Sequence, residues 1–266
     1  MYSHRVFQTE YAGHPITFRF LNPETLRFFQ GWLRLADADT ADVAVTPELL
    51  EYARPLNPPG EKDSYIEYRC LIAQTSLALL KYDCCIFHCA CFVWRGYAWL
   101  LTAPSGTGKT TQYLNWQKAH PGELTMLSGD MPVLERREDG SVWAHPTTWN
   151  GKENLGSRIS APVGGVVLLE QGPENVLTPL SVRDGLIPIF QQFLVRPDTE
   201  EQIRALGRLM DQMFRELPFW KLVNLGDPAS TELIRDAFAQ HAASLPAVSV
   251  PASAERAPAR EKGTVT

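Results

Sequence analysis

The sequence has no apolar run long enough to cross a membrane, and no apolar stretch follows a basic start at its amino terminus. A membrane-spanning helix needs roughly 20 mainly apolar residues, and a secretory signal needs a shorter apolar segment. A basic surplus is missing too, because 25 Lys and Arg stand against 30 Asp and Glu. Nucleic-acid-binding domains usually carry such a surplus. We therefore expect a cytoplasmic protein that binds neither membrane nor nucleic acid.

Cysteine is scarce and unevenly placed, at positions 70, 84, 85, 89 and 91. The odd number and the crowding suit a reducing compartment better than a disulfide framework. A zinc site made of Cys84, Cys85, His88, Cys89 and Cys91 is one interpretation, but their spacing lacks a second, separated pair of ligands. Strand alternation points Cys89 and Cys91 to one side and His88 to the other. Buried thiols on a core strand are the favoured interpretation.

Changes of hydrophobic period along the chain predict a mixed α/β protein. A hairpin is expected over 6–20, a helix from Asn22 onward, and a long helix over 61–82. Further strands are expected over 85–94, 97–102, 124–127, 132–136, 141–144, 163–170 and 220–225, and helices over 109–120, 184–195, 198–216 and 228–242.

The chain is expected to divide into an N-terminal α+β region, a nucleotide-binding domain and a tail. The first spans residues 1–84 and packs on the core, and the second spans 85–243. Residues 244–266 are rich in Pro, Ala and Ser without apolar periodicity, and we expect them to be disordered.

The segment Ala103–Thr111 carries the strongest chemical signal. It fits the phosphate-binding pattern G-x-x-x-x-G-K-[ST] with alanine at the first glycine position, between a predicted strand and a predicted helix. A glycine-rich turn with a chance lysine is the alternative, and the agreement of strand, loop and helix disfavours it. The predicted binding residues are Pro104, Ser105, Gly106, Thr107, Gly108, Lys109, Thr110 and Thr111.

The residue types in this segment suit a polyphosphate. Gly106 and Gly108 let successive backbone N–H groups turn toward phosphate oxygens, and the following helix adds a partial positive charge. Lys109 can reach the β- and γ-phosphates, and the Thr110 hydroxyl can ligate Mg²⁺. The segment therefore predicts ATP and Mg²⁺ as ligands.

Residues around the loop resemble a known family. Phe87-His88-Cys89-Ala90, Gly96 and the run Leu100–Thr111 are similar to the catalytic domain of HPr kinase/phosphorylase, and the loop is similar to that of ATP-dependent phosphoenolpyruvate carboxykinase, which shares the fold. Ser128-Gly129-Asp130 and Trp149-Asn150-Gly151-Lys152-Glu153 extend the resemblance to about residues 85–240. It implies an HPr kinase C-terminal, carboxykinase-like P-loop fold with a small N-terminal α+β region.

The resemblance also implies an activity, which is transfer of a γ-phosphoryl group to a serine-type hydroxyl of a protein, a peptide or a small molecule. By the same resemblance, Asp130 would serve the metal or the acceptor, and His88 would lie near the phosphates. Lys152 would neutralise charge on the transferred group. The resemblance implies a homo-oligomer as well.

The chain departs from this family at Met131, where a second acid is common, and Glu153 or Glu170 would then supply the missing carboxylate. Each site residue also has a plain structural interpretation. Asp130 suits a strand-end turn, His88 a buried core position, and Lys152 a solvated loop. Arg158, another candidate cation, fits a solvated loop better.

Two other functions compete with the kinase. The first is an ATP-binding regulatory or accessory protein with little turnover, which Met131 makes credible. The second is a P-loop hydrolase, but the sequence has neither Asn-Lys-x-Asp for guanine nor Leu-Ser-Gly-Gly-Gln of transporter ATPases. Carboxykinase activity itself is disfavoured because the chain is too short and an oxaloacetate-binding part is not recognisable.

Overall fold

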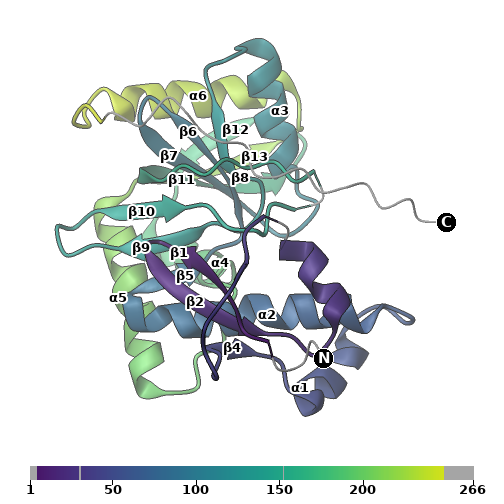
Figure 1. The fold of residues 1–266 in the computed structure, drawn as a ribbon. Helices are drawn as coiled ribbons and strands as arrows, with labels where there is room; N and C mark the ends of the chain where they lie inside the picture. The colour runs from purple at the N-terminus through teal and green to yellow at the C-terminus, as the bar shows by residue number, and fades with distance from the viewer. Residues whose placement is uncertain (1–4, 30, 152, 249–266) are drawn as a thin grey trace.

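The computed structural model describes residues 5–29, 31–151 and 153–248, which form two β-sheets with helices around them (Figure 1). The larger sheet has nine strands. Seven follow the order β5 (Cys84–Ile86), β9 (Val133–Arg136), β10 (Val142–His145), β11 (Ala161–Gln171), β7 (Tyr97–Thr102), β6 (Cys89–Trp94) and β8 (Thr125–Ser128). β13 (Phe219–Asn224) pairs with β11, and β12 (Val176–Pro179) pairs with β13.

Strand directions in the larger sheet are mixed. β11 runs parallel to β7 and β13, whereas β6 runs antiparallel to β7 and β8. The long β11 is buried from Ala161 to Leu169, as a strand with both faces covered should be. The predicted mixed α/β class is confirmed, while the finer assignment to a particular P-loop fold stays a prediction.

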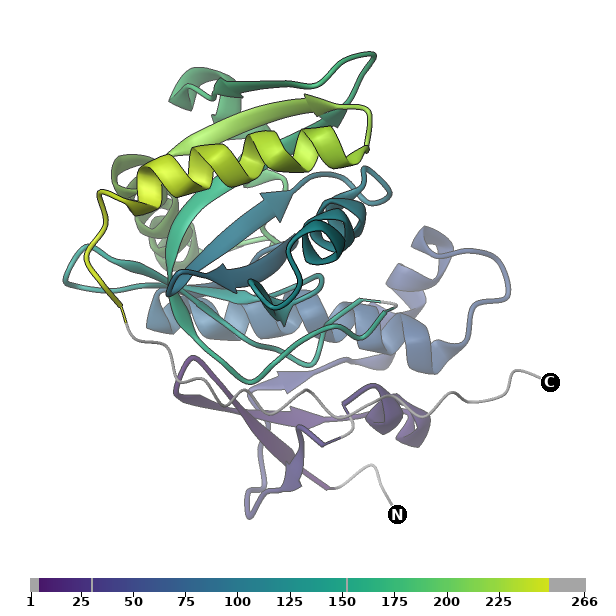
Figure 2. The same cartoon turned by 90° about the horizontal axis from the view of Figure 1, so that it is seen from above.

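Helices cover both faces of this sheet. α3 (Lys109–Ala119) and α6 (Pro228–Ala242) contact each other and lie over one face (Figure 2), where aromatic side chains such as Phe92, Trp116 and Phe238 form the core. α4 (Val182–Phe190) and α5 (Glu200–Glu216) pack on the opposite face, where α5 contributes its apolar stripe to a cluster that includes Leu209 and Met213.

The smaller sheet belongs to the N-terminal region and has the order β3 (Arg34–Leu35), β1 (Phe7–Tyr11), β2 (His14–Arg19) and β4 (Val43–Ala44). α1 (Pro47–Ala53) and α2 (Asp63–Leu79) follow it, with 3-10 turns η1 (Pro23–Phe29), η2 (Arg54–Leu56) and η3 (Leu80–Tyr82). α2 contacts α1, η1, β4 and also β5 of the larger sheet. It therefore joins the two sheets.

Two predictions about local structure were wrong, and four elements were not predicted. The expected strand over 85–94 is two strands, because the chain leaves β9 at Phe87 and joins β7 and β8 from Cys89. The helix expected from Asn22 is only the 3-10 turn η1, in which the Thr25 amide bonds to the carbonyl of Asn22. α1, β3, β4 and β12 had no clear periodic signal and were not expected.

The end of the described chain contacts the larger sheet. The Tyr97 hydroxyl donates to the carbonyl of Pro246 at 2.7 Å, and Leu245 and Val248 pack on the aromatic cluster. Residues 249–266 of the expected tail lie outside the described residues. No helix within the described ranges combines the length and apolarity that crossing a bilayer requires.

Candidate phosphate-binding site

Sheet topology brings three chain segments to one edge of the larger sheet. β7 and β8 both run antiparallel to β6, so their carboxyl ends meet at the edge where β6 begins. The register pairs Cys89 with Thr102, the last residue of β7, and Cys91 with Ser128, the last residue of β8. The phosphate loop, Asp130 and His88 follow or precede these strand ends and therefore lie together.

The loop has the backbone that its glycines predict. Gly106 and Gly108 have φ angles of 83° and 108°, a region that residues with a Cβ rarely adopt. Gly108 is also the N-cap of α3, so the first free N–H groups of that helix face the loop. Ala103, which replaces the usual first glycine, is fully buried and is not one of the positive-φ residues. Alanine therefore fits there without strain.

Lys109 is held inside the loop. Its Nζ donates to the carbonyl of Ala103 at 2.8 Å and to that of Pro104 at 3.3 Å. The side chain is buried, and burial lowers its pKa, while nearby Asp130 acts in the opposite direction. A buried ammonium that contacts only neutral carbonyls has a strong preference for an anion nearby.

Asp130 and His88 form a pair at the strand ends. His88 Nε2 lies 3.3 Å from Asp130 Oδ1, and His88 Nδ1 lies 3.1 Å from Gln192 Oε1. Gln192 is oriented in turn by its own Nε2, which donates to the carbonyl of Pro188 at 3.2 Å. The histidine ring is thus fixed from both sides, with one nitrogen toward Asp130.

The loop after β10 packs directly against this pair. Gly151 lies so close to Asp130 that a Cβ on the glycine would come within 3.2 Å of the aspartate Cβ. The Met131 amide donates to the carbonyl of Trp149 at 3.1 Å. These contacts hold the Asp130 side chain at the sheet edge.

A cavity of about 580 Å³ opens at this edge. A volume of this size is in the usual range for a small-molecule or cofactor site. Its walls come from the phosphate loop, both strand ends, the loop after β10 and α2. The lining residues are Tyr65, Tyr68, Arg69, Ile72, His88, Ser105, Gly106, Gly108, Lys109, Thr110, Thr111, Gly129, Asp130, Met131, Trp149, Gly151 and Glu153.

Most predicted site residues line the cavity, and a few do not. Pro104 and Thr107 are not among the lining residues, and the Thr107 hydroxyl donates to the Pro104 carbonyl at 2.8 Å. Of the two proposed extra carboxylates, Glu153 lines the cavity, whereas Glu170 pairs with Lys221 at 2.5 Å outside the lining. Lys152 lies outside the described residues.

Arg158 is directed to a different cavity. Its guanidinium donates to the carbonyl of Gly31 and lies 4.7 Å from the centre of the Trp32 ring. This other cavity, of about 410 Å³, lies between the N-terminal sheet and β10. The Arg158 side chain is exposed, which is consistent with the solvated loop favoured for it, and it does not line the cavity at the phosphate loop.

The sequence analysis missed the part of the cavity wall formed by α2. Tyr65, Tyr68, Arg69 and Ile72 follow the helical spacing of one face, and all of them line the cavity. Tyr68 is buried, whereas Tyr65 and Arg69 are exposed. Two tyrosines and an arginine on one helical face were a visible signal, but nothing local indicated that this face meets the phosphate loop.

The cysteines behave as core thiols. All five are free, and Cys84, Cys85, Cys89 and Cys91 are buried. Burial raises the pKa of Cys85 to about 12 and that of Cys91 further, so both stay protonated near neutrality. Cys89 and Cys91 face the same core cluster, as strand alternation predicted.

No protein-family model matches the chain, and no curated protein matches it. Among solved structures, the chain is similar to the Hpr(Ser) kinase/phosphatase from Coxiella burnetii, with a TM-score of 0.35 and 10% sequence identity over 58% of this chain and 97% of that chain. A TM-score this low does not establish a common fold.

Proposed function

We propose that this protein is a phosphotransferase that moves the γ-phosphoryl group of ATP to a serine-type hydroxyl of a protein, a peptide or a small molecule. One observation carries the proposal. Phosphate-loop residues such as Gly108 and Lys109 line the same cavity as the carboxylate of Asp130. Phosphoryl transfer needs this combination, because catalysis consists mainly of positioning and of charge stabilisation.

The phosphate side of the cavity suits a nucleoside triphosphate. A Cβ added to Gly106 would meet no atom within 4 Å, so the space above the loop backbone is open. Lys109 can exchange its carbonyl partners for phosphate oxygens, a change that gives its buried positive charge a partner of opposite charge. The loop amides and the start of α3 then bind and orient the phosphates.

Thr110 and Asp130 are the residues that would hold Mg²⁺, since both line the cavity and offer the oxygen ligands that this ion prefers. The metal ion, when bound, neutralises charge on the phosphates. Asp130 can also accept the proton of the acceptor hydroxyl, with His88 fixing its orientation. Glu153 is available in the same cavity as the second carboxylate that Met131 does not provide.

The alternative is an ATP-binding regulatory protein with little turnover, and Met131 favours it. The Met131 side chain belongs to the cavity lining, next to Asp130, where a second acid would separate the metal and acceptor roles. Both functions predict binding of ATP, so only transfer distinguishes them.

The test is phosphoryl transfer from labelled ATP with Mg²⁺ to free serine, to seryl peptides and to proteins of a source-cell extract. We expect labelled product with the unaltered protein and a loss of about 100-fold or more with Asp130→Asn. Asp211→Asn is the matched control, because it makes the same chemical change at an exposed position on α5. Product from the control but not from Asp130→Asn supports the proposal.

Two results would contradict the proposed transfer. ATP binding without product from any acceptor would favour the regulatory alternative. Equal product from both variants would show that Asp130 has no part in the reaction. Calorimetry of ATP binding on the same protein samples separates a failure of binding from a failure of chemistry.

A further inference from the structure

A second group of potential ligands lies away from the phosphate site, between the two sheets. His14 of β2, Cys84 of β5 and Glu135 of β9 each place one ligand atom within 4.8 Å of the others. The three side chains offer an imidazole nitrogen, a sulfur and a carboxylate oxygen. Neither the phosphate cavity nor the proposed transfer uses any of them.

Strand register holds two of the three ligands together. Cys84 and Glu135 are direct partners in the antiparallel pair of β5 and β9, so their side chains leave the sheet on the same face. The neighbouring Cys85 faces the opposite side, where it belongs to the core cluster covered by α5. Cys84 belongs instead to the cluster shared with the N-terminal sheet.

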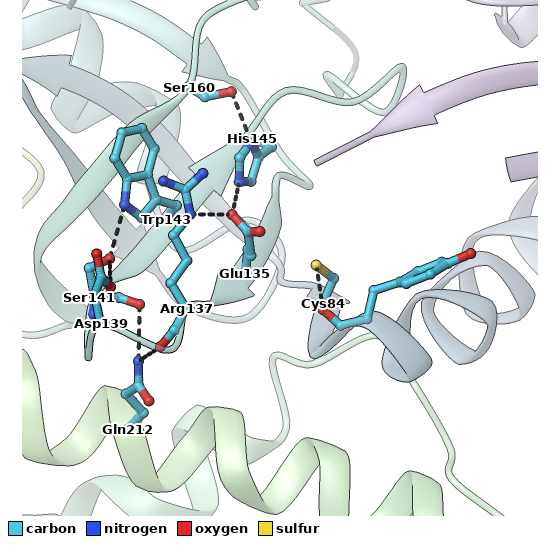
Figure 3. A network of polar contacts seen from close by, with 10 residues as sticks. Cys84, Glu135, Arg137, Asp139, Ser141, Trp143, His145, Ser160 and Gln212 are labelled. Carbon is cyan, nitrogen blue, oxygen red and sulfur yellow. Dashed lines mark hydrogen bonds and ion pairs between the residues drawn. The ribbon is translucent and has the colours of Figure 1, made fainter. Parts of the chain in front are cut away.

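Glu135 has one carboxylate oxygen engaged and one free. Oε2 lies 2.9 Å from His145 Nε2 and 2.8 Å from Arg137 Nε. His145 Nδ1 lies 2.9 Å from the Ser160 hydroxyl, so the ring is fixed at both nitrogens (Figure 3). Within the described chain, Oε1 of Glu135 has no hydrogen-bond partner. Such supporting hydrogen bonds are usual behind a carboxylate that binds a metal.

His14 is delivered to this group by the turn between β1 and β2. Ala12 and Gly13 have φ angles of 52° and 78°, which gives a tight hairpin with Tyr11 opposite His14. The imidazole stacks on the ring of Tyr82 with centroids 3.9 Å apart. In the part of the chain that the structure describes, neither ring nitrogen has a hydrogen-bond partner.

We propose that His14, Cys84 and Glu135 form a binding site for Zn²⁺ or a similar transition-metal ion, with a fourth position open to water. Imidazole, thiolate and carboxylate are the three ligand types of zinc sites, whereas Mg²⁺ and Ca²⁺ prefer oxygen alone. Binding replaces the thiol proton of Cys84 with the metal and releases that proton to solvent. His145 and Arg137 position Glu135 and do not bind the metal.

The position of this site gives it a structural role. One ligand comes from the N-terminal sheet and two come from the larger sheet, so the metal ties the sheets together. β5 leads directly to His88, and β9 begins shortly after Asp130. The bound metal therefore stabilises β5 and β9, which lie next to the His88–Asp130 pair in the chain. It does not contribute to the phosphate cavity itself.

Cobalt binding tests the site, because Co²⁺ replaces zinc and a thiolate ligand gives it intense near-ultraviolet absorption. The full chain is stripped with a chelator and titrated with Co²⁺ and then with Zn²⁺. We expect one cobalt per chain with a thiolate band, and displacement of that band by Zn²⁺. Cys84→Ser should abolish the band, whereas Cys85→Ser and Cys70→Ser should keep it.

A second variant covers the case in which Cys84→Ser fails to fold. His14→Gln changes a partly exposed side chain, and it should weaken cobalt binding by roughly 10-fold or more while keeping the thiolate band at saturation. Absence of any thiolate band in the unaltered protein would overturn the proposal. So would a band that survives in folded Cys84→Ser, or unchanged affinity in His14→Gln.

Discussion

The phosphate cavity has two unlike walls. The first, here called the loop wall, consists of the phosphate loop with His88 and Asp130, and much of its chemistry comes from backbone amides and strand ends. The second, the α2 wall, consists of Tyr65, Tyr68, Arg69 and Ile72, and all of its chemistry comes from side chains. Backbone donors suit a ligand part common to many enzymes, such as phosphate, whereas side chains suit the part that differs.

Aromatic rings form much of the core behind each wall. The N-terminal core contains stacked and edge-on aromatic rings, including Phe18, Phe20 and Phe29. Trp149, from the loop beside Asp130, is fully buried in it and lies 5.4 Å from Tyr11 between ring centres. The N-terminal core therefore includes residues of the larger-sheet region, such as Val133 and Trp149, and Trp149 couples the two walls.

We infer that the two walls have different roles. The loop wall binds the phosphate donor, and the α2 wall contacts the acceptor. This inference rests on the proposed function. Four predictions, the first three taken from the largest expected effect to the smallest, concern the two walls and the backbone near them.

Lys109→Ala should give the largest effect, because it removes the only loop side chain that brings a full positive charge to the phosphates. We expect kcat/KM to fall by about 10² to 10³. Lys118→Ala, at an exposed position near the end of the same helix, is the control. Equal effects of the two variants would mean that the loop wall does not bind the donor.

Glu67→Ala should destabilise the α2 wall. The fully buried Glu67 carboxylate accepts from the amides of Leu21 and Asn22 at 2.6 and 2.9 Å and from the Thr25 hydroxyl at 2.6 Å. Removing it leaves the part-buried amides of Leu21 and Asn22 without this partner, while the Thr25 hydroxyl keeps the Ser64 carbonyl at 3.2 Å, and we expect a cost of about 3 kcal/mol. Denaturant unfolding measures the cost, with exposed Glu216→Ala as reference. If Glu67→Ala lowered the free energy of unfolding no more than Glu216→Ala does, Glu67 would not anchor α2.

The kinetics of Arg69→Ala test whether the two walls contact different substrates. If the α2 wall contacts the acceptor, KM for the acceptor should rise about 10-fold, a loss of about 1.4 kcal/mol, while KM for ATP stays the same. Arg69 Nη1 also donates to Asn57 Oδ1 at 2.6 Å, so Asn57→Ala tests whether that contact alone matters. A rise in KM for ATP instead would place Arg69 on the donor side.

Gly108→Ala and Gly207→Ala should shift thermal stability in opposite directions. Gly108 has a φ angle of 108°, so alanine there costs about 1 to 3 kcal/mol. Gly207 lies inside α5 with no atom within 4 Å of an added Cβ, so alanine should stabilise by about 0.5 to 1 kcal/mol. Calorimetric melting of both variants checks this. Stabilisation by Gly108→Ala would contradict the strained loop backbone.

Local signals predicted the elements of the loop wall well. The strand over 97–102 matches β7, and the glycines at 106 and 108 have the positive φ angles that their positions implied. These features depend on contiguous residues, whose conformational preferences are local and do not depend on tertiary contacts. The break at Phe87 was missed because apolar residues continue through it, and only the change of pairing partner from β9 to β7 creates it.

The sequence by itself determined the glycine-rich loop between β7 and α3, the alternation of strands and helices, and the buried thiols, since each depends on local backbone freedom or periodic burial. Only the tertiary structure decided that α2 faces the loop, that Glu153 and not Glu170 lines the cavity, and that His14, Cys84 and Glu135 converge. These juxtapositions join residues far apart in the chain. They arise from the sum of many weak packing contacts, which no short segment encodes.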